Sequence, residues 1–229
     1  MPKDGSLDLL NEVEENLATM KEMQQIRPVK VKSILEHLRS SLEYVANDTY
    51  DKYVTPPPAK RPRIYFPYGD QSRIDKFFTR ELNVNPPSSS PLYEIFNSIQ
   101  DFRTGDNAFT MMCNLTNEVK HRKPIPLEED STIKDVSVNV EGLGLIKGDR
   151  NLIINFKGNY LNGERIEDFT YKNGILENIG NGIPVNIVIT EEKKIRFHGI
   201  EYEVIPFIEI CLKRIRAVVN EAYEALDDI

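Results

Sequence analysis

This sequence of 229 residues has only two cysteines, Cys113 and Cys211, and few long apolar runs. Each cysteine lies within an apolar helical pattern, so we expect buried reduced thiols rather than a disulfide. No apolar run approaches the roughly 20 residues that a membrane-spanning helix needs. The first residues, Met-Pro-Lys-Asp-Gly-Ser, also lack a signal-peptide core. We therefore expect no membrane association and a cytoplasmic location.

Familiar catalytic patterns are missing as well. The sequence has no glycine-rich phosphate loop followed by lysine and serine or threonine, no paired cysteine spacing for zinc, and no Gly-x-Ser-x-Gly turn. Its three histidines fall in different predicted elements, so we expect no metal site and no cofactor. The net charge of -7 argues against a protein that coats nucleic acid through its overall field, although it is compatible with a local basic patch.

The first half of the chain has helical periodicity. Apolar residues at helical spacing predict an amphipathic helix over residues 7–26 and a longer helix that begins at Pro28 and packs antiparallel to it. Three shorter helices are expected at residues 72–82, 91–99 and 107–121, which gives a bundle of about five helices. In the long helix, Arg39 and Glu43 are four residues apart and are expected to pair on its exposed face.

After Pro126 the period changes to that of strands. Val136, Val138 and Val140 alternate with polar residues, and Asn162-Gly163 is a strong hairpin signal. Further strands are expected before and after a turn at Glu191-Glu192. From Pro206 a continuous apolar stripe predicts a long helix that returns to the bundle. The sequence thus predicts an α+β fold: a helical bundle (1–126), an inserted antiparallel β-meander (127–203) and a C-terminal helix (204–229).

A basic connector follows the proline run at 56–58. Cationic residues there alternate with aromatic ones, and a second basic cluster follows shortly after it. This mixture is typical of a groove for single-stranded nucleic acid, in which bases stack and cations meet phosphates. The alternative is a loop that its aromatic residues fix to the bundle while its charges stay in water. The candidate nucleic-acid-binding residues are Lys60, Arg61, Arg63 and Arg73.

The stretch from Asn107 to Ile125 contains the most compact polar group. Asn117 and His121 are four residues apart, hence on the same helical face, and Lys120 lies beside them. A histidine in a basic setting can take a proton from a ribose hydroxyl while a cation stabilises the phosphorane. The competing explanation is structural, because cations at the end of a helix interact favourably with its negative pole.

Three segments resemble HEPN-like helical bundles, with the resemblance covering roughly residues 28–124. They are the long helix from Ile34, the sequence Ile-Tyr-Phe-Pro-Tyr at 64–68, and Asn-Leu-Thr-Asn-Glu-Val-Lys-His-Arg at 114–122. The resemblance implies a helical bundle, often dimeric, and many such domains are ribonucleases in toxin-antitoxin or other bacterial defence systems. Their signature is Arg-Asn-x-x-x-His. Asn117 and His121 match it, whereas Thr116 stands where the arginine belongs.

Because that arginine is missing, the resemblance implies a non-catalytic interaction or dimerisation module, with a second copy or another protein as its partner, in a bacterial defence or toxin-antitoxin context. Two alternatives remain open. One is a metal-independent endoribonuclease that uses His121 and Asn117 with a cation such as Lys120. The other is a protein that binds single-stranded nucleic acid, including RNA, through the basic connector.

Overall fold

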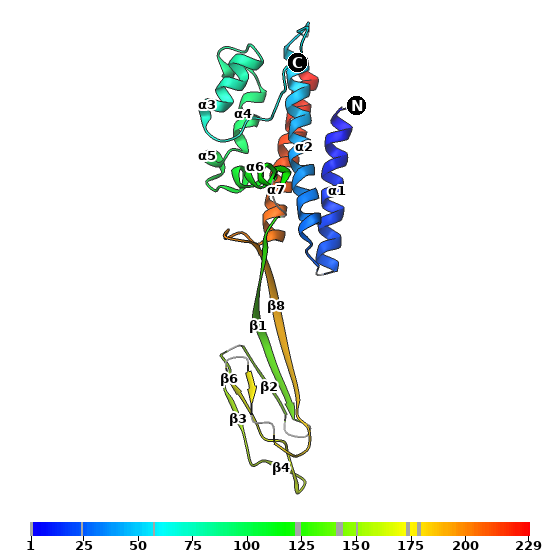
Figure 1. Cartoon of the computed structure of the whole chain (residues 1–229), viewed down its shortest axis with the longest axis vertical. Helices are drawn as coiled ribbons and strands as arrows, with labels where there is room; N and C mark the ends of the chain where they lie inside the picture. Colours follow the sequence, from blue (N-terminus) through cyan, green and yellow to red (C-terminus); the bar gives the residue numbers. More distant parts are fainter. Residues whose placement is uncertain are drawn as a thin grey trace. The chain divides into compact units, whose positions relative to one another are not determined.

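The computed structural model describes residues 2–23, 25–56, 58–121, 125–140, 144–149, 151–172, 175–177 and 180–229. The fold is α+β, as the sequence predicted (Figure 1). The chain divides into two compact units, a helical unit of residues 1–127 with 196–229 and a β unit of residues 128–195. The helical unit therefore includes residues 196–203, which the sequence had grouped with the β insertion.

The helical unit is built on three long helices. Helices α1, α2 and α7 pack against one another, with α1 and α2 antiparallel, and α6 runs across α2 and α7 (Figure 1). The predicted apolar stripe of α7 is buried along its length, which confirms that this helix returns to the bundle. The helices are α1 (Pro2–Glu22), α2 (Pro28–Tyr53), α3 (Gln71–Lys76), the π-helix η1 (Phe77–Glu81), the 3-10 helix η2 (Pro87–Ser89), α4 (Leu92–Ser98), α5 (Asp101–Thr104), α6 (Ala108–His121) and α7 (Val204–Asp228).

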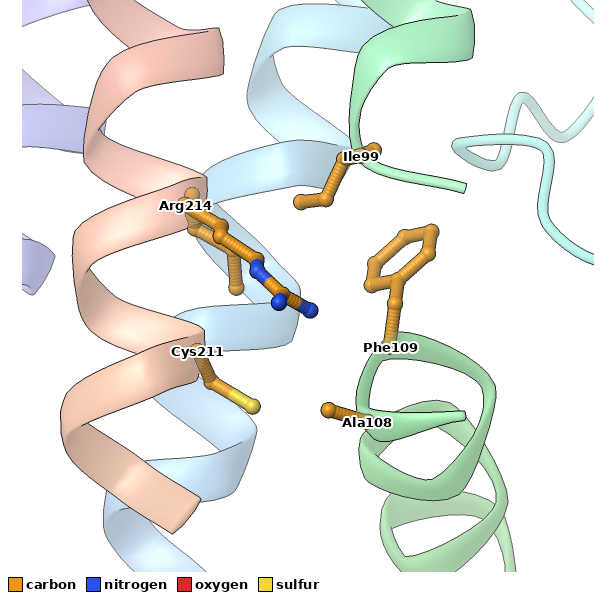
Figure 2. Close-up of a pocket in the computed structure, with 6 residues that line it drawn as sticks. Ile99, Ala108, Phe109, Cys211 and Arg214 are labelled. Atoms are coloured by element: carbon orange, nitrogen blue, oxygen red, sulfur yellow. The ribbon is translucent and has the colours of Figure 1, made fainter. Parts of the chain in front are cut away.

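The junction between α6 and α7 is closely packed. Figure 2 shows Phe109 and Ala108 of α6 facing Cys211 and Arg214 of α7, with Ile99 above them. The cavity between these side chains has a volume of about 10 Å³, which is room for about one water molecule. Both cysteines are buried free thiols, as expected. This cavity is therefore a packing gap and not a ligand site.

An ion pair joins α7 to the start of α6. The guanidinium of Arg214 donates from Nη1 to Oδ1 of Asp106 (2.8 Å) and from Nη2 to Oδ2 (2.6 Å). Oδ1 of Asp106 also accepts from the backbone N–H of Ala108 (3.0 Å). These hydrogen bonds, that of Arg214 first, hold the pKa of Asp106 below its usual range.

Asp106 should therefore make stability depend on pH. Since its folded-state pKa is lower than the unfolded value of about 3.9, its contribution is present above that value and is lost as the pH falls through the folded pKa. We expect Asp106→Asn to lower the midpoint of urea unfolding at pH 7, and the difference from wild type to shrink at pH 3. Circular dichroism at 222 nm measures both, with Asp8→Asn on the exposed face of α1 as the control. A difference of equal size at both pH values would contradict this role of Asp106.

The β unit consists of antiparallel strands in three small sheets. The strand orders are β2-β1-β8, β3-β6-β7 and β4-β5, so the last strand lies beside the first. Val136, Val138, Ile154, Ile166, Phe169 and Tyr171 form its apolar core. The strands are β1 (Leu127–Val140), β2 (Gly144–Gly148), β3 (Ile154–Phe156), β4 (Tyr160–Leu161), β5 (Glu164–Arg165), β6 (Phe169–Lys172), β7 (Ile175–Glu177) and β8 (Asn186–Phe197).

One turn prediction is confirmed in the β unit and another is wrong. Asn162 and Gly163 join β4 to β5 with φ angles of 51° and 86°, the left-handed conformation that a tight hairpin requires. By contrast, Glu191-Glu192 lies within β8, which is one continuous strand. The charged pair therefore marks no turn, because pairing along the 14-residue strand β1 keeps β8 extended. Among the helices that the structure describes, none has the length and apolarity to cross a bilayer.

Candidate functional site

The connector between α2 and α3 has two faces of different character. Ile64 and Phe66 are buried, whereas Arg63 and Tyr65, which alternate with them, are exposed, and 59% of Tyr65 is accessible. This alternation is what an extended chain produces, because successive side chains point to opposite sides. Phe66 stacks on Phe96 with ring centroids 4.5 Å apart. The inner face of the connector thus fixes the outer face in place.

A buried polar group holds the connector backbone. Glu43 accepts the backbone N–H of Phe66 on Oε2 and Nε of Arg39 on Oε1, both at 2.6 Å. Gln100 donates from Nε2 to the carbonyl oxygen of Pro67 (3.1 Å). The predicted pairing of Arg39 with Glu43 is confirmed, but its placement on an exposed face is wrong, since only 7% of Arg39 is accessible. The helical period of α2 gave no sign that the connector would cover this face.

Arg39 also contacts Cys113 and Tyr68. Its Nη1 donates to Sγ of Cys113 (2.7 Å), and its guanidinium lies 4.8 Å from the centre of the Tyr68 ring. Burial raises the pKa of the Cys113 thiol to about 12, although the guanidinium opposes this effect. The thiol is therefore neutral, and Cys113 is a packing residue with no role as a nucleophile.

Opposite the connector, α3 and η1 present a row of cations. Arg73, Lys76 and Arg80 follow one another at spacings of three and four residues, and all three are exposed. Asp70 caps the start of α3, since its Oδ1 accepts the backbone N–H of Arg73 (3.1 Å). Behind the row, Asp75 accepts a hydrogen bond from Tyr93 of α4 (2.6 Å). The cationic face is thus held by a capped helix that is fastened to the bundle.

Two open hollows lie between these walls. The first, which we call the Asn117 hollow, has a volume of about 350 Å³. The second, the Arg80 hollow, has a volume of about 340 Å³. Both are lined by Tyr65, Pro67 and Arg73, so they adjoin there and we refer to them together as the groove. The Asn117 hollow is further lined by Arg39, Phe66, Tyr68 and Asn117, and the Arg80 hollow by Arg63, Ile64, Lys76, Phe77, Arg80 and Glu81.

The predicted nucleic-acid-binding residues fall into three groups according to their position relative to the groove. Arg63 and Arg73 line it, and within the described chain neither they nor Lys76 and Arg80 form an ion pair. Arg61 has a structural role instead, because it pairs with Asp51 (3.0 Å). Lys60 is exposed but lines neither hollow. Lys76 and Arg80, which with Arg73 form the second basic cluster of the sequence, complete the cationic wall.

The catalytic candidates are only partly described. Asn117 lines the groove and donates from Nδ2 to the hydroxyl of Tyr68 (2.9 Å). Lys120 and His121 form the last turn of α6, but their side chains lie outside the described part of the structure. Thr116 is buried, and its hydroxyl donates to the backbone oxygens of Met112 and Cys113. Position 116 therefore faces the core.

Comparisons with known proteins give no family. No protein-family model, curated protein or solved structure matches the chain. The HEPN-like resemblance, and the interaction or dimerisation module expected from it, therefore stay predictions. Within the described residues, no group of three histidine, cysteine, aspartate or glutamate side chains is placed to hold a metal ion.

Proposed function

We propose that this protein binds single-stranded nucleic acid in the groove. The observation that carries the proposal is that four cations without an ion pair among the described residues line the same hollow as the exposed ring of Tyr65, namely Arg63, Arg73, Lys76 and Arg80. Grooves for single strands combine cations for the backbone with an aromatic platform on which a base stacks. An unpaired strand is required because the bases of a duplex are already stacked on one another and do not reach Tyr65.

The charge distribution supports the same reading. The whole chain has a net charge of -7, yet the described residues that line the groove include five cationic side chains and one carboxylate, that of Glu81. With a helical rise of about 1.5 Å per residue, Arg73 to Arg80 span about 10 Å along the wall. A row of that length can meet successive phosphates of one strand. Since these cations form no ion pair within the described residues, they can bind phosphates without first breaking one.

The salt dependence of binding tests this proposal. For single strands the slope of log K against log salt is about 0.7 for each phosphate that is neutralised. We expect Arg73→Ala and Arg80→Ala each to lower the slope by about that amount. Fluorescence anisotropy with a labelled twelve-residue strand measures it. Lys60→Ala is the matched control, because it removes an exposed cation outside the groove. A flat salt response of the wild type would defeat the proposal, as would an equal effect of Lys60→Ala.

A second candidate function is metal-independent cleavage of RNA. It is favoured by the position of Asn117, since Arg39 and Arg73 line the same hollow and offer the cationic charge that is missing at Thr116. His121 follows Asn117 by one helical turn and is the candidate base. Incubation of the pure protein with mixed RNA in EDTA, beside His121→Ala, decides the matter. Cleavage that the variant loses would support the nuclease, whereas intact RNA at high protein concentration would leave binding alone.

A further inference from the structure

We infer that the Asn117 hollow takes one unpaired base of the bound strand, and that Asn117 reads the edge of this base. The inference rests on the proposed function and adds that binding depends on base identity. It follows from a difference between the two hollows. Four consecutive ring-bearing residues, Tyr65 to Tyr68, line the Asn117 hollow, and two of these also line the Arg80 hollow. Three exposed cations line the Arg80 hollow alone, namely Arg63, Lys76 and Arg80. Flat apolar walls suit a base, and cations suit phosphates.

The charge of the Asn117 hollow is also largely compensated. Arg39 is its buried cation, and its guanidinium is paired with Glu43 at 2.6 Å. Arg73, which both hollows share, is the cation of this lining that has no ion pair in the described chain. A phosphate is therefore held better in the Arg80 hollow. The Asn117 hollow, at about 350 Å³, is within the range of small-molecule pockets, about 300–1,000 Å³.

The amide of Asn117 is held in a position to read a base. Its Nδ2 donates to the hydroxyl of Tyr68, and Tyr68 is itself fixed between Arg39 and the edge of Phe109. An amide has two donor hydrogens and an acceptor oxygen, so one N–H and Oδ1 remain for a ligand. Such a pair matches the adjacent donor and acceptor on a base edge, as in asparagine contacts with adenine N6 and N7. Tyr65, largely accessible, is the ring on which the base stacks.

A change of base preference tests this inference. The probes are twelve-residue thymidine strands in which three thymidines are replaced by adenosine, by guanosine or by abasic sites. We expect wild type to bind the adenosine strand about fivefold or more tightly than the abasic strand. Asn117→Asp exchanges the amide donor for an acceptor, and guanine presents two donors, N1–H and N2–H, on one edge. The ratio of the dissociation constant for the adenosine strand to that for the guanosine strand should therefore rise about fivefold or more in this variant.

An added negative charge weakens the binding of both strands alike, so it cancels in the ratio of their dissociation constants. Asn114→Asp adds the same charge at an exposed position of α6 outside the hollow and should leave the ratio unchanged. If wild type binds all strands equally, abasic included, and its salt dependence persists, the base-reading inference is wrong but the proposed function stands. If no strand binds, the proposed function itself fails. A shift of the ratio by Asn114→Asp as large as that of Asn117→Asp would also overturn the inference.

Discussion

Replacing Phe66 with alanine is expected to lower the free energy of unfolding by about 3–5 kcal/mol. Replacing its neighbour Tyr65 should change it by less than about 0.5 kcal/mol. The difference arises because 1% of Phe66 and 59% of Tyr65 are accessible. Phe66 stacks on Phe96 and meets the edge of Phe109, so its removal leaves a cavity beneath the connector. Urea unfolding followed by circular dichroism gives both values.

Replacing Tyr65 should change stability little but should weaken the binding of a single strand. Because its ring is the proposed stacking platform, Tyr65→Ala is expected to weaken binding of a single strand by about 1–3 kcal/mol. Tyr65→Phe keeps the ring and should bind almost as tightly as wild type. Anisotropy titrations of the two variants at one salt concentration provide the comparison. Wild-type affinity of a folded Tyr65→Ala protein would show that no base stacks on this ring.

In the β unit the largest effect is expected from Gly182→Ala. A methyl group at this position would lie 2.5 Å from the backbone nitrogen of Glu167 and 2.8 Å from the carbonyl oxygen of Arg165. Both atoms are already hydrogen-bonded, since the N–H of Glu167 donates to the carbonyl oxygen of Ile183 (3.0 Å) and the N–H of Ile183 donates to that of Arg165 (2.9 Å). They therefore have little freedom to move. We expect a loss of about 3 kcal/mol in the stability of the β unit. Hydrogen exchange should show faster exchange of β3 and β6 amides, while α2 and α7 remain protected.

Gly163→Ala is the control for this steric effect. Gly163 has a φ angle of 86°, but a methyl group there would meet no atom within 4 Å. Its cost is therefore only that of left-handed backbone, about 1–2 kcal/mol. If Gly182→Ala left the exchange of β3 and β6 unchanged, or cost no more than Gly163→Ala, the close approach at Gly182 would not constrain the fold.

Much of the helical unit follows from local periodicity. The stripe from Val31 to Thr49 in α2 and that from Phe207 to Leu226 in α7 are buried as their spacing predicted, because one face of each helix must cover a core. The burial of Arg39 was not predictable in this way. A charged residue beside an apolar stripe is normally solvated, and only the covering connector, held by Glu43 and Gln100, reverses that rule.

The candidate site shows the same division between local and tertiary information. The sequence shows the alternation of polar and apolar residues from Arg63 to Phe66. It also shows the helical spacing of the cations from Arg73 to Arg80. That Asn117 of α6 joins them depends on how α6 crosses α2, which no short stretch of sequence encodes. The burial of Thr116 is likewise a tertiary feature that the spacing of residues 114–122 did not reveal.

The neighbouring positions of β1 and β8 have a consequence for how the chain can change in length. The chain leaves the helical unit after Leu127 and returns at Arg196, and at the base of this excursion the backbone N–H of His198 donates to the carbonyl oxygen of Pro126 (3.0 Å). The helical unit thus holds both ends of the excursion together, whatever lies between them. Because the entropy of closing a loop grows only with the logarithm of its length, exchanging residues 128–195 for a short turn, or for a domain of another size, costs this unit little. Pro126 and His198 are therefore natural graft points, at which new domains can be exchanged while the groove stays intact.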